Sequence, residues 1–139
     1  MQIKPQLFAL VAIGCAMASC KSTTTYNSSS EVKPASAGQV EHVVLVWMKD
    51  PTDSATRQKI IAATKTFRQI PGVIDARAGR AVPGARPVID SSFDVGIVVT
   101  FKDRAALDAY GPHPIHDKAA RELIVPAMKS IKVYDTELE

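Results

Sequence analysis

The sequence predicts one α+β domain over residues 40–139, in which strands and helices follow the order β-α-β-β-α-β. Two observations support this prediction. Short β-branched runs alternate with segments of helical periodicity, and Pro71-Gly72 and Gly111-Pro112 separate neighbouring segments. The 139-residue chain leaves room for a single domain, and its composition is ordinary for a globular protein.

The first strand is expected over residues 41–48, a run of β-branched and aromatic residues that is apolar on both faces. Its alternate residues divide into one set with His42, Val44, Val46 and Met48 and another with Val43, Leu45 and Trp47. Asp53 or Ser54 can cap a following helix that runs to about residue 70. That helix carries an apolar stripe made of Ile60, Ala63, Phe67 and Ile70.

The middle of the domain is expected to hold two strands joined by a long connection. The second strand covers residues 73–80, and a Pro- and Gly-rich excursion over residues 81–91 follows it. The third strand covers residues 92–102 and alternates between two faces. One of these faces carries Phe93, Val95, Ile97, Val99 and Phe101.

The last part of the domain is expected to hold an interrupted helix and a final strand. Asp103 can cap a short helix that ends at Tyr110, before Gly111-Pro112. His113 then stands at an N-cap position with Pro114 at the first helical position, and this helix runs to about residue 125. The final strand covers residues 130–135.

These elements give a ferredoxin-like β-α-β-β-α-β sheet with the helices on one face. Two helices cover one face of a four-stranded sheet, yet the first strand is apolar on both faces. A large uncovered apolar face marks an interaction site. We therefore predict a homodimer in which two sheets pack face to face and enclose a barrel-like space.

The segment before the domain predicts a bacterial lipoprotein precursor. Residues 1–19 have the layout of a secretory signal peptide, with a short basic start, an uncharged apolar run over residues 7–17 and small residues before Cys20. Met17-Ala18-Ser19-Cys20 resembles a lipobox, which implies cleavage before Cys20 and attachment of lipid to it, with Cys15 as a second candidate. Because Lys21 rather than Asp follows Cys20, the resemblance to Gram-negative sorting signals implies the outer membrane, facing the periplasm.

The lipidated cysteine is expected to begin a flexible tether over residues 20–39, which is rich in Ser and Thr and poor in large apolar residues. The domain itself has no cysteine, so it has neither a disulfide nor a thiol nucleophile. It carries 14 basic and 13 acidic side chains with no basic stripe, so nucleic acid is not an expected partner.

Three motifs in the domain resemble the stress-responsive A/B barrel family, a branch of the dimeric α+β barrel proteins. They are Glu41-His42-Val43-Val44-Leu45, Ile70-Pro71-Gly72-Val73, and the run from Phe101-Lys102-Asp103 through Tyr110 to His113-Pro114-Ile115-His116. Their order and spacing agree over residues 40–136. The resemblance implies a dimeric α+β barrel, but it does not imply one activity.

The resemblance also implies a candidate site. The cavity positions of a plant polyketide cyclase in the family fall here on His42, Tyr110 and His116, while two others fall on the apolar Ala63 and Val95. Histidine suits proton transfer near neutral pH, so we assign His116 as a general base that acts with Tyr110 and His42. We assign ligand contacts to His113, Val44 and Val46.

Structural roles are the alternative for the same residues. His113 can simply cap a helix, His42 can be a core or interface residue, and Tyr110 can close the interrupted helix against the sheet. His113 and His116 have a spacing suited to a metal, but no third ligand is evident unless His42 or Asp117 converges on them, so a metal is not expected. No cofactor is expected either.

Three functions remain open at this level. The first is a lipid-anchored dimeric module that binds a small apolar ligand in the dimer barrel. The second is a cavity enzyme of the lyase or cyclase type with His116 as base. The third is haem or oxygen chemistry of the monooxygenase kind, for which no specific sequence pattern is present.

Overall fold

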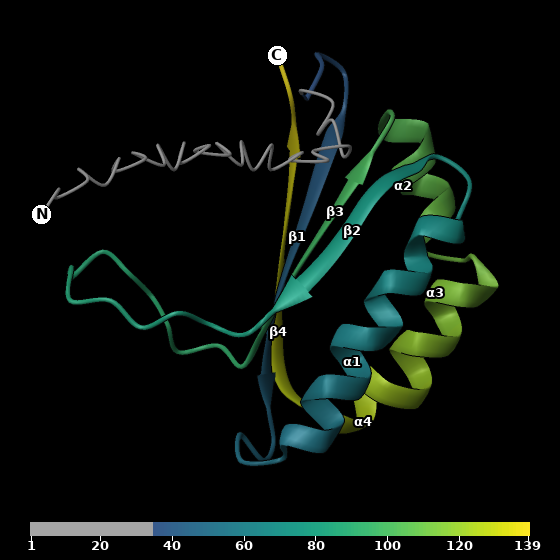
Figure 1. The fold of residues 1–139 in the computed structure, drawn as a ribbon. Helices are drawn as coiled ribbons and strands as arrows, with labels where there is room; N and C mark the ends of the chain where they lie inside the picture. The colour runs from purple at the N-terminus through teal and green to yellow at the C-terminus, as the bar shows by residue number, and fades with distance from the viewer. Residues whose placement is uncertain (1–34) are drawn as a thin grey trace, which may run out of the picture. The chain divides into compact units, whose positions relative to one another are not determined.

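The computed structural model describes residues 35–139, so the predicted signal peptide, Cys20, Cys15 and the tether up to residue 34 lie outside the described residues. Four strands form one antiparallel sheet in the order β2-β3-β1-β4 (Figure 1). The strands are β1 (Val40–Met48), β2 (Val73–Gly79), β3 (Val95–Phe101) and β4 (Met128–Glu137). The predicted element order and the ferredoxin-like sheet are confirmed.

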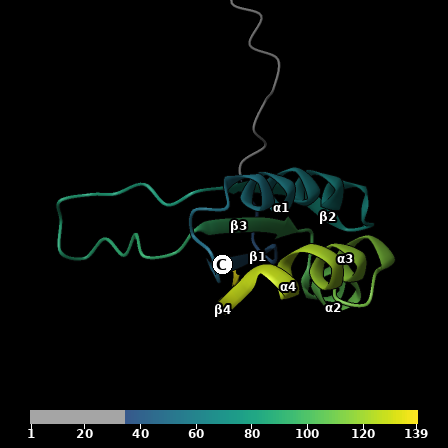
Figure 2. The ribbon, with the colours of Figure 1, turned by 90° about the horizontal axis from the view of Figure 1, so that it is seen from below.

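The helices pack on one face of this sheet (Figure 2). They are α1 (Ser54–Thr66), α2 (Arg104–Tyr110), α3 (Pro114–Ala119) and α4 (Val125–Ala127), with a 3₁₀ turn over Phe67–Gln69 after α1. The predicted caps are confirmed, because the Asp53 carboxylate accepts from the Thr56 N–H and the Asp103 carboxylate accepts from the Ala106 N–H. His113 caps α3, with Pro114 at its first position.

A π-helical turn over Ala120–Ile124 joins α3 to α4. In this turn the Val125 N–H donates to the carbonyl of Ala120, five residues back. Pro126 follows at once and has no N–H, so the chain cannot continue a regular ladder of i→i−4 hydrogen bonds there. The turn therefore contains one residue more than an α-helical turn would.

The core lies between the sheet and the helices. On β1 and β3 it takes the alternate residues that the sequence grouped together, and Val46, Val95, Val99 and Phe101 have no exposed surface. Ile60, Phe67 and Ile70 of the predicted apolar stripe are buried against them, whereas Thr64, rather than Ala63, completes the buried side of α1.

One residue of the predicted third strand lies on the other face. Phe93 precedes β3, and its ring packs edge-on against Trp47, 6.4 Å between centroids, on the side away from the helices. The physical reason is that Asp94 is fixed to β1 by two hydrogen bonds, which end the regular alternation before β3 begins: its carboxylate accepts from the Met48 N–H and its N–H donates to the Val46 carbonyl. The grouping of Phe93 with Val95 was therefore wrong.

The last residues of the predicted tether are also ordered by the domain. Gly38 N–H donates to the carbonyl of Leu138, and Leu138 N–H donates to that of Gln39, so residues 36–39 form a turn against the end of β4. Gly38 takes φ +81°, a conformation that favours glycine. Within residues 35–139, no helix has the length and apolar character needed to cross a membrane.

The face of the sheet opposite the helices is called the open face here. It carries alternate residues of each strand, chiefly Asp75, Arg77, Glu41, Val43, Leu45, Trp47, Val98, Thr100, Lys132 and Tyr134. The apolar half of this face is centred on β1 and formed by Val43, Leu45, Trp47, Val98 and Tyr134, although β4 also contributes Lys132. The β2 half is charged.

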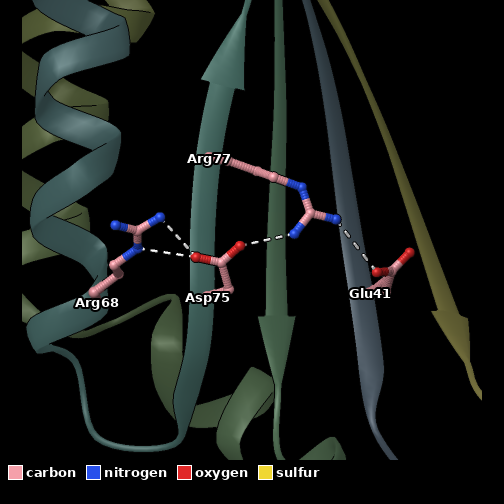
Figure 3. A network of polar contacts seen from close by, with 4 residues as sticks. All are labelled: Glu41, Arg68, Asp75 and Arg77. Atoms are coloured by element: carbon pink, nitrogen blue, oxygen red, sulfur yellow. Dashed lines mark hydrogen bonds and ion pairs between the residues drawn. The ribbon is translucent and has the colours of Figure 1, made fainter. Parts of the chain in front are cut away.

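The charged half of the open face is a row of ion pairs (Figure 3). Arg77 reaches Asp75 at 2.7 Å and Glu41 at 3.6 Å, and Arg68 reaches the other oxygen of Asp75 at 2.7 Å. Burial acts to raise the pKa of Asp75, but hydrogen bonds from Arg77 and Arg68 outweigh it, so the pKa of this carboxyl lies below its usual range.

Candidate functional site

A cavity of about 260 Å³ lies between the sheet and the segment from α3 to α4. Three polar or aromatic side chains from the sequence-based assignment line it, namely His42, Tyr110 and His116. Its remaining walls are mostly apolar and are formed by Val44, Phe67, Ile97, Ala120, Ile124, Val125, Met128, Ile131 and Val133. The structure therefore brings His42, Tyr110 and His116 together at one cavity, a point that the sequence left open.

The sequence predicted a site in the space between the sheets of two copies. The cavity lies elsewhere. It lies on the helix-covered face of a single chain, because the alternation of β1 points His42 and Val44 toward the helices. The three residues that carry the candidate chemistry all come from one copy of the chain.

The aromatic rings around Tyr110 hold one another in place. Tyr110 and His116 lie 4.2 Å apart between ring centroids with a tilt of 43°, and His42 meets Tyr110 edge-on at 5.8 Å. Phe67 and Phe101 pack edge-on against Tyr110 at 5.6 and 5.0 Å. Such aromatic contacts add to the energy of burial and restrict ring rotation.

His116 has its tautomer set by the backbone. Its Nδ1 lies 2.8 Å from the carbonyl oxygen of Gly111. A carbonyl has no proton to give, so the Nδ1–H of His116 donates and the neutral ring keeps its lone pair on Nε2. Gly111 stands where Gly-Pro breaks the helix between α2 and α3, and this break exposes the carbonyl. The ring therefore has the form required of a general base.

Tyr110 is held as a hydrogen-bond donor. Burial raises the pKa of its phenol well above the ordinary value, so the hydroxyl stays protonated. Among residues 35–139 the structure gives this hydroxyl no hydrogen-bond partner, although the residue lines the cavity. The O–H is thus available to a bound molecule.

His42 is oriented by a residue that the sequence analysis did not identify. Its Nδ1 lies 2.6 Å from a carboxylate oxygen of Asp135, which stands directly opposite it in the β1–β4 pairing. The carboxylate accepts, so the Nδ1–H of His42 donates, and Nε2 is the free nitrogen of the neutral ring. Knowledge of the strand register would have revealed Asp135, but a list of motifs does not contain it.

The residues assigned to ligand contact separate into two groups. Val44 lines the cavity, whereas Val46, two residues further along β1, is fully buried and does not line it. His113 lies outside the cavity wall, and its Nδ1 accepts from the Ile115 N–H at 3.3 Å. His113 therefore has the capping role that was the structural alternative. Ala63 and Val95 do not line the cavity either.

The arrangement supplies acid–base groups without a metal cluster. In the described part of the chain, no group of three or more His, Cys, Asp or Glu side chains is arranged to hold a metal ion. The available chemistry is that of the Nε2 lone pair of His116, the Tyr110 hydroxyl and His42 in an apolar enclosure. Electrostatic interactions are stronger in such an enclosure than in water.

Comparison with known proteins places this architecture. Residues 40–138 match the family model described as the stress responsive A/B barrel domain. No curated protein matches the chain. A Dabb family protein with a ferredoxin-like fold from Mesorhizobium loti is 26% identical, with a TM-score of 0.59 over 73% of this chain and 98% of that one.

Two further solved structures show the same fold. A dimeric ferredoxin-like protein of unknown function from Jannaschia sp. CCS1 is 26% identical, with a TM-score of 0.57 over 73% of this chain and 100% of that one. A hydroxynitrile lyase from Passiflora edulis is 21% identical, with a TM-score of 0.64 over 75% of this chain and 96% of that one. With the family model matched over nearly all of residues 40–139, the chain belongs to the stress-responsive A/B barrel domain family.

Proposed function

We propose that the cavity binds a small, largely apolar carbonyl compound and that His116 acts on it as a general base in a lyase- or cyclase-type reaction. The observation that carries this proposal is the hydrogen bond from His116 Nδ1–H to the Gly111 carbonyl, which leaves Nε2 as the proton acceptor. A positioned base of this kind contributes about 10²- to 10⁴-fold in rate.

Tyr110 supplies the complementary acid. When His116 removes a proton next to a carbonyl, negative charge develops on the carbonyl oxygen, and the protonated Tyr110 hydroxyl donates to it. Burial keeps the pKa of Tyr110 high, so the hydroxyl does not compete with His116 for the role of base. His42, oriented by Asp135, provides a second imidazole at the same cavity.

The walls indicate the substrate class. At about 260 Å³ the cavity is close to the lower end, roughly 300 Å³, of the volumes usual for small-molecule sites. Its lining is mostly apolar, with polar groups confined to the end formed by His42, Tyr110 and His116. A short aldehyde or ketone that carries a hydrogen on the carbon next to the carbonyl, with an aliphatic or aromatic remainder, combines the two requirements. The similarity in fold to a hydroxynitrile lyase is in keeping with such a substrate.

Exchange of carbon-bound protons tests the proposal without knowledge of the natural substrate. A panel of small aldehydes and ketones is incubated with the protein in D₂O, and loss of the proton next to the carbonyl is followed by NMR. We expect His116→Ala to lower the catalysed rate by about 10²-fold or more, and Tyr110→Phe to lower it less. Lys118→Ala, on the exposed side of α3, is the control. An unchanged rate in His116→Ala would sink the assignment.

A non-catalytic binding module is the second candidate, favoured by the mostly apolar cavity wall. Ile131 and Val133 of β4 line the cavity and are 39% and 47% exposed, so its mouth is apolar as well. In this case apolar compounds raise the melting temperature, and His116→Ala leaves that shift in place. If no compound in the panel changes the melting temperature, the binding module is excluded.

We also propose that two copies associate through their open faces. Its support is the apolar half of that face and the Jannaschia relative, which is itself described as dimeric. Sedimentation velocity over a range of concentrations tests the association. A chain that sediments as a monomer throughout would refute it.

The lipid anchor at Cys20 stays part of the proposal, with the outer membrane, facing the periplasm, as its site. The support is the lipobox-like Met17-Ala18-Ser19-Cys20 followed by Lys21. Metabolic labelling with palmitate in a Gram-negative host should be lost in Cys20→Ser and kept in Cys15→Ser. The reverse result would move the anchor to Cys15.

A further inference from the structure

The connection between β2 and β3 is longer than a sheet of this kind needs. Residues 80–94 contain no helix or strand, and residues 80–91, called the arm here, lead away from the sheet. In both views the arm extends on the side opposite the helices (Figure 1, Figure 2). It therefore extends past the open face rather than over the cavity.

The base of the arm is fixed to the open face. Trp47 Nε1–H donates to the Ser92 hydroxyl at 3.0 Å, and the rings of Trp47 and Phe93 pack edge-on. Asp94 makes two hydrogen bonds to β1: its carboxylate accepts from the Met48 N–H, and its own N–H donates to the Val46 carbonyl. These contacts direct the arm outward from the apolar half of the open face.

The arm exposes apolar side chains that the chain itself does not cover. Val82 and Val88 are 79% and 85% exposed, the highest values among the large apolar residues of the described part. The arm nevertheless has internal order, because Ile89 N–H donates to the Arg86 carbonyl and the Ile89 side chain packs against Gly84. Burying these two exposed valines against another surface would remove apolar area from water and so favour the contact.

We propose that the arm clasps a second copy of this chain, with Val82 and Val88 packed against the flank of the partner seated on the open face. The inference rests on the proposed association through that face. A second copy is the occupant that fits, because the arm rises from the same apolar area, around Trp47 and Phe93, that the partner would cover. Two-fold symmetry gives each copy one arm and one contact surface.

The test uses residues 35–139, since the sheet, the helices and the core described above all lie within them. The double variant Val82→Ser/Val88→Ser removes the two valines from positions that are exposed in the single chain, so its fold is not at risk. We expect the dimer dissociation constant from sedimentation velocity to rise by ~10-fold or more, as burial of two valines implies. Val125→Ser, which alters an exposed valine on the helix side, is the matched control.

A second readout reports contact directly. Residues 35–139 contain no cysteine, so Val88→Cys gives a single thiol. Its alkylation by N-ethylmaleimide should be slowed several-fold at concentrations where the chain is dimeric, and Val125→Cys should react equally at all concentrations.

Three results would overturn the proposal, and they are distinguishable. A dimer with an unchanged dissociation constant in Val82→Ser/Val88→Ser, or with an unprotected thiol in Val88→Cys, would reject the arm and leave the open-face dimer intact. A wild-type chain that never dimerises would reject both. Binding of the wild type, but not of the double variant, to vesicles of phosphatidylethanolamine and phosphatidylglycerol, with the dimer unaffected, would assign the arm to a lipid surface instead.

Discussion

On the helix-covered face, β1 presents His42 and Val44 in the wall of a cavity. The intervening residues Glu41, Val43 and Leu45 point to the open face, away from the helices. The polar groups of the two faces are treated differently. His42 and His116 each have one ring nitrogen bound, by Asp135 and by the Gly111 carbonyl, and keep the other free. Glu41 instead belongs to a row of ion pairs that solvent reaches.

The difference follows from the cost of burial. A polar group in an apolar enclosure needs a hydrogen-bond partner. A polar atom without such a partner is retained where a ligand can bind to it. On a surface, ion pairs contribute little to the free energy of unfolding and can be exchanged for contacts with a partner. The covered face is therefore the candidate site of chemistry and the open face the candidate site of association.

The largest effect is expected from the covered face. Phe101→Ala removes a fully buried ring that packs edge-on against Tyr110 and His42, and should lower the free energy of unfolding by about 3–5 kcal/mol. Urea denaturation of residues 35–139, at a concentration low enough to suppress association, measures it. Val98→Ala on the open face of the same strand serves as the comparison. If Phe101→Ala lowered the free energy of unfolding less than Val98→Ala, the covered face would not be the one that stabilises the fold.

Trp47→Ala, on the open face, should lower both the stability of the single chain and the affinity between two copies. The ring is half-buried, packs on Phe93 and donates to Ser92, so its loss should cost the single chain about 1–2 kcal/mol. The same change should weaken the dimer more than it weakens the fold, as comparison of urea denaturation with sedimentation velocity would show. Trp47→Phe, which keeps an aromatic ring, should retain most of the association.

Asp103→Ala tests how the covered face positions Tyr110. Asp103 caps α2, at whose other end Tyr110 stands, and loss of such a cap costs about 1 kcal/mol. Asp103→Asn, which keeps a side-chain acceptor, should lose only part of this in urea denaturation. Equal losses in the two variants would mean that the charge of Asp103, rather than its capping bond, stabilises the helix.

Asp75→Asn should have the smallest effect, below about 1 kcal/mol, because the ion pairs around it are partly exposed to solvent. Its folded-state pKa is lowered, so the carboxylate stabilises the fold fully above the unfolded value, about 3.9. That contribution disappears as the pH falls through the folded-state pKa. The difference between wild type and variant in thermal unfolding should therefore be present at pH 7 and absent in strong acid. A difference that grows on acidification would contradict the assignment.

Much of the fold could be predicted from local patterns. The His113-Pro114 pair specified the start of α3, and the alternation of β1 separated His42 and Val44 from Val43 and Leu45. These are nearest-neighbour properties of the chain, which a sequence displays directly. Phe93 was assigned to the wrong face because two long-range hydrogen bonds between Asp94 and β1 end the alternation one residue later.

The candidate site was predictable in its residue types but not in its location. Tyr110, His116 and His42 were identified, yet the wall that encloses them depends on how α3 and α4 cross the sheet. The partners that set the histidine tautomers were also out of reach. One is the backbone carbonyl of Gly111, which no residue type encodes, and the other is Asp135, 93 residues away from His42.

The π-helical turn over Ala120–Ile124 affects how this cavity could change in the course of evolution. Ala120, Ile124 and Val125 all belong to the wall, and they stand at or just beyond a single inserted residue. Deletion of one residue from the turn would let regular i→i−4 hydrogen bonds form again and would change which side chains between Ala120 and Val125 face the cavity. Such a length change reshapes several wall positions in one step while His42, Tyr110 and His116 stay where they are. New ligands would then be acquired through gain or loss of a codon as well as through substitution.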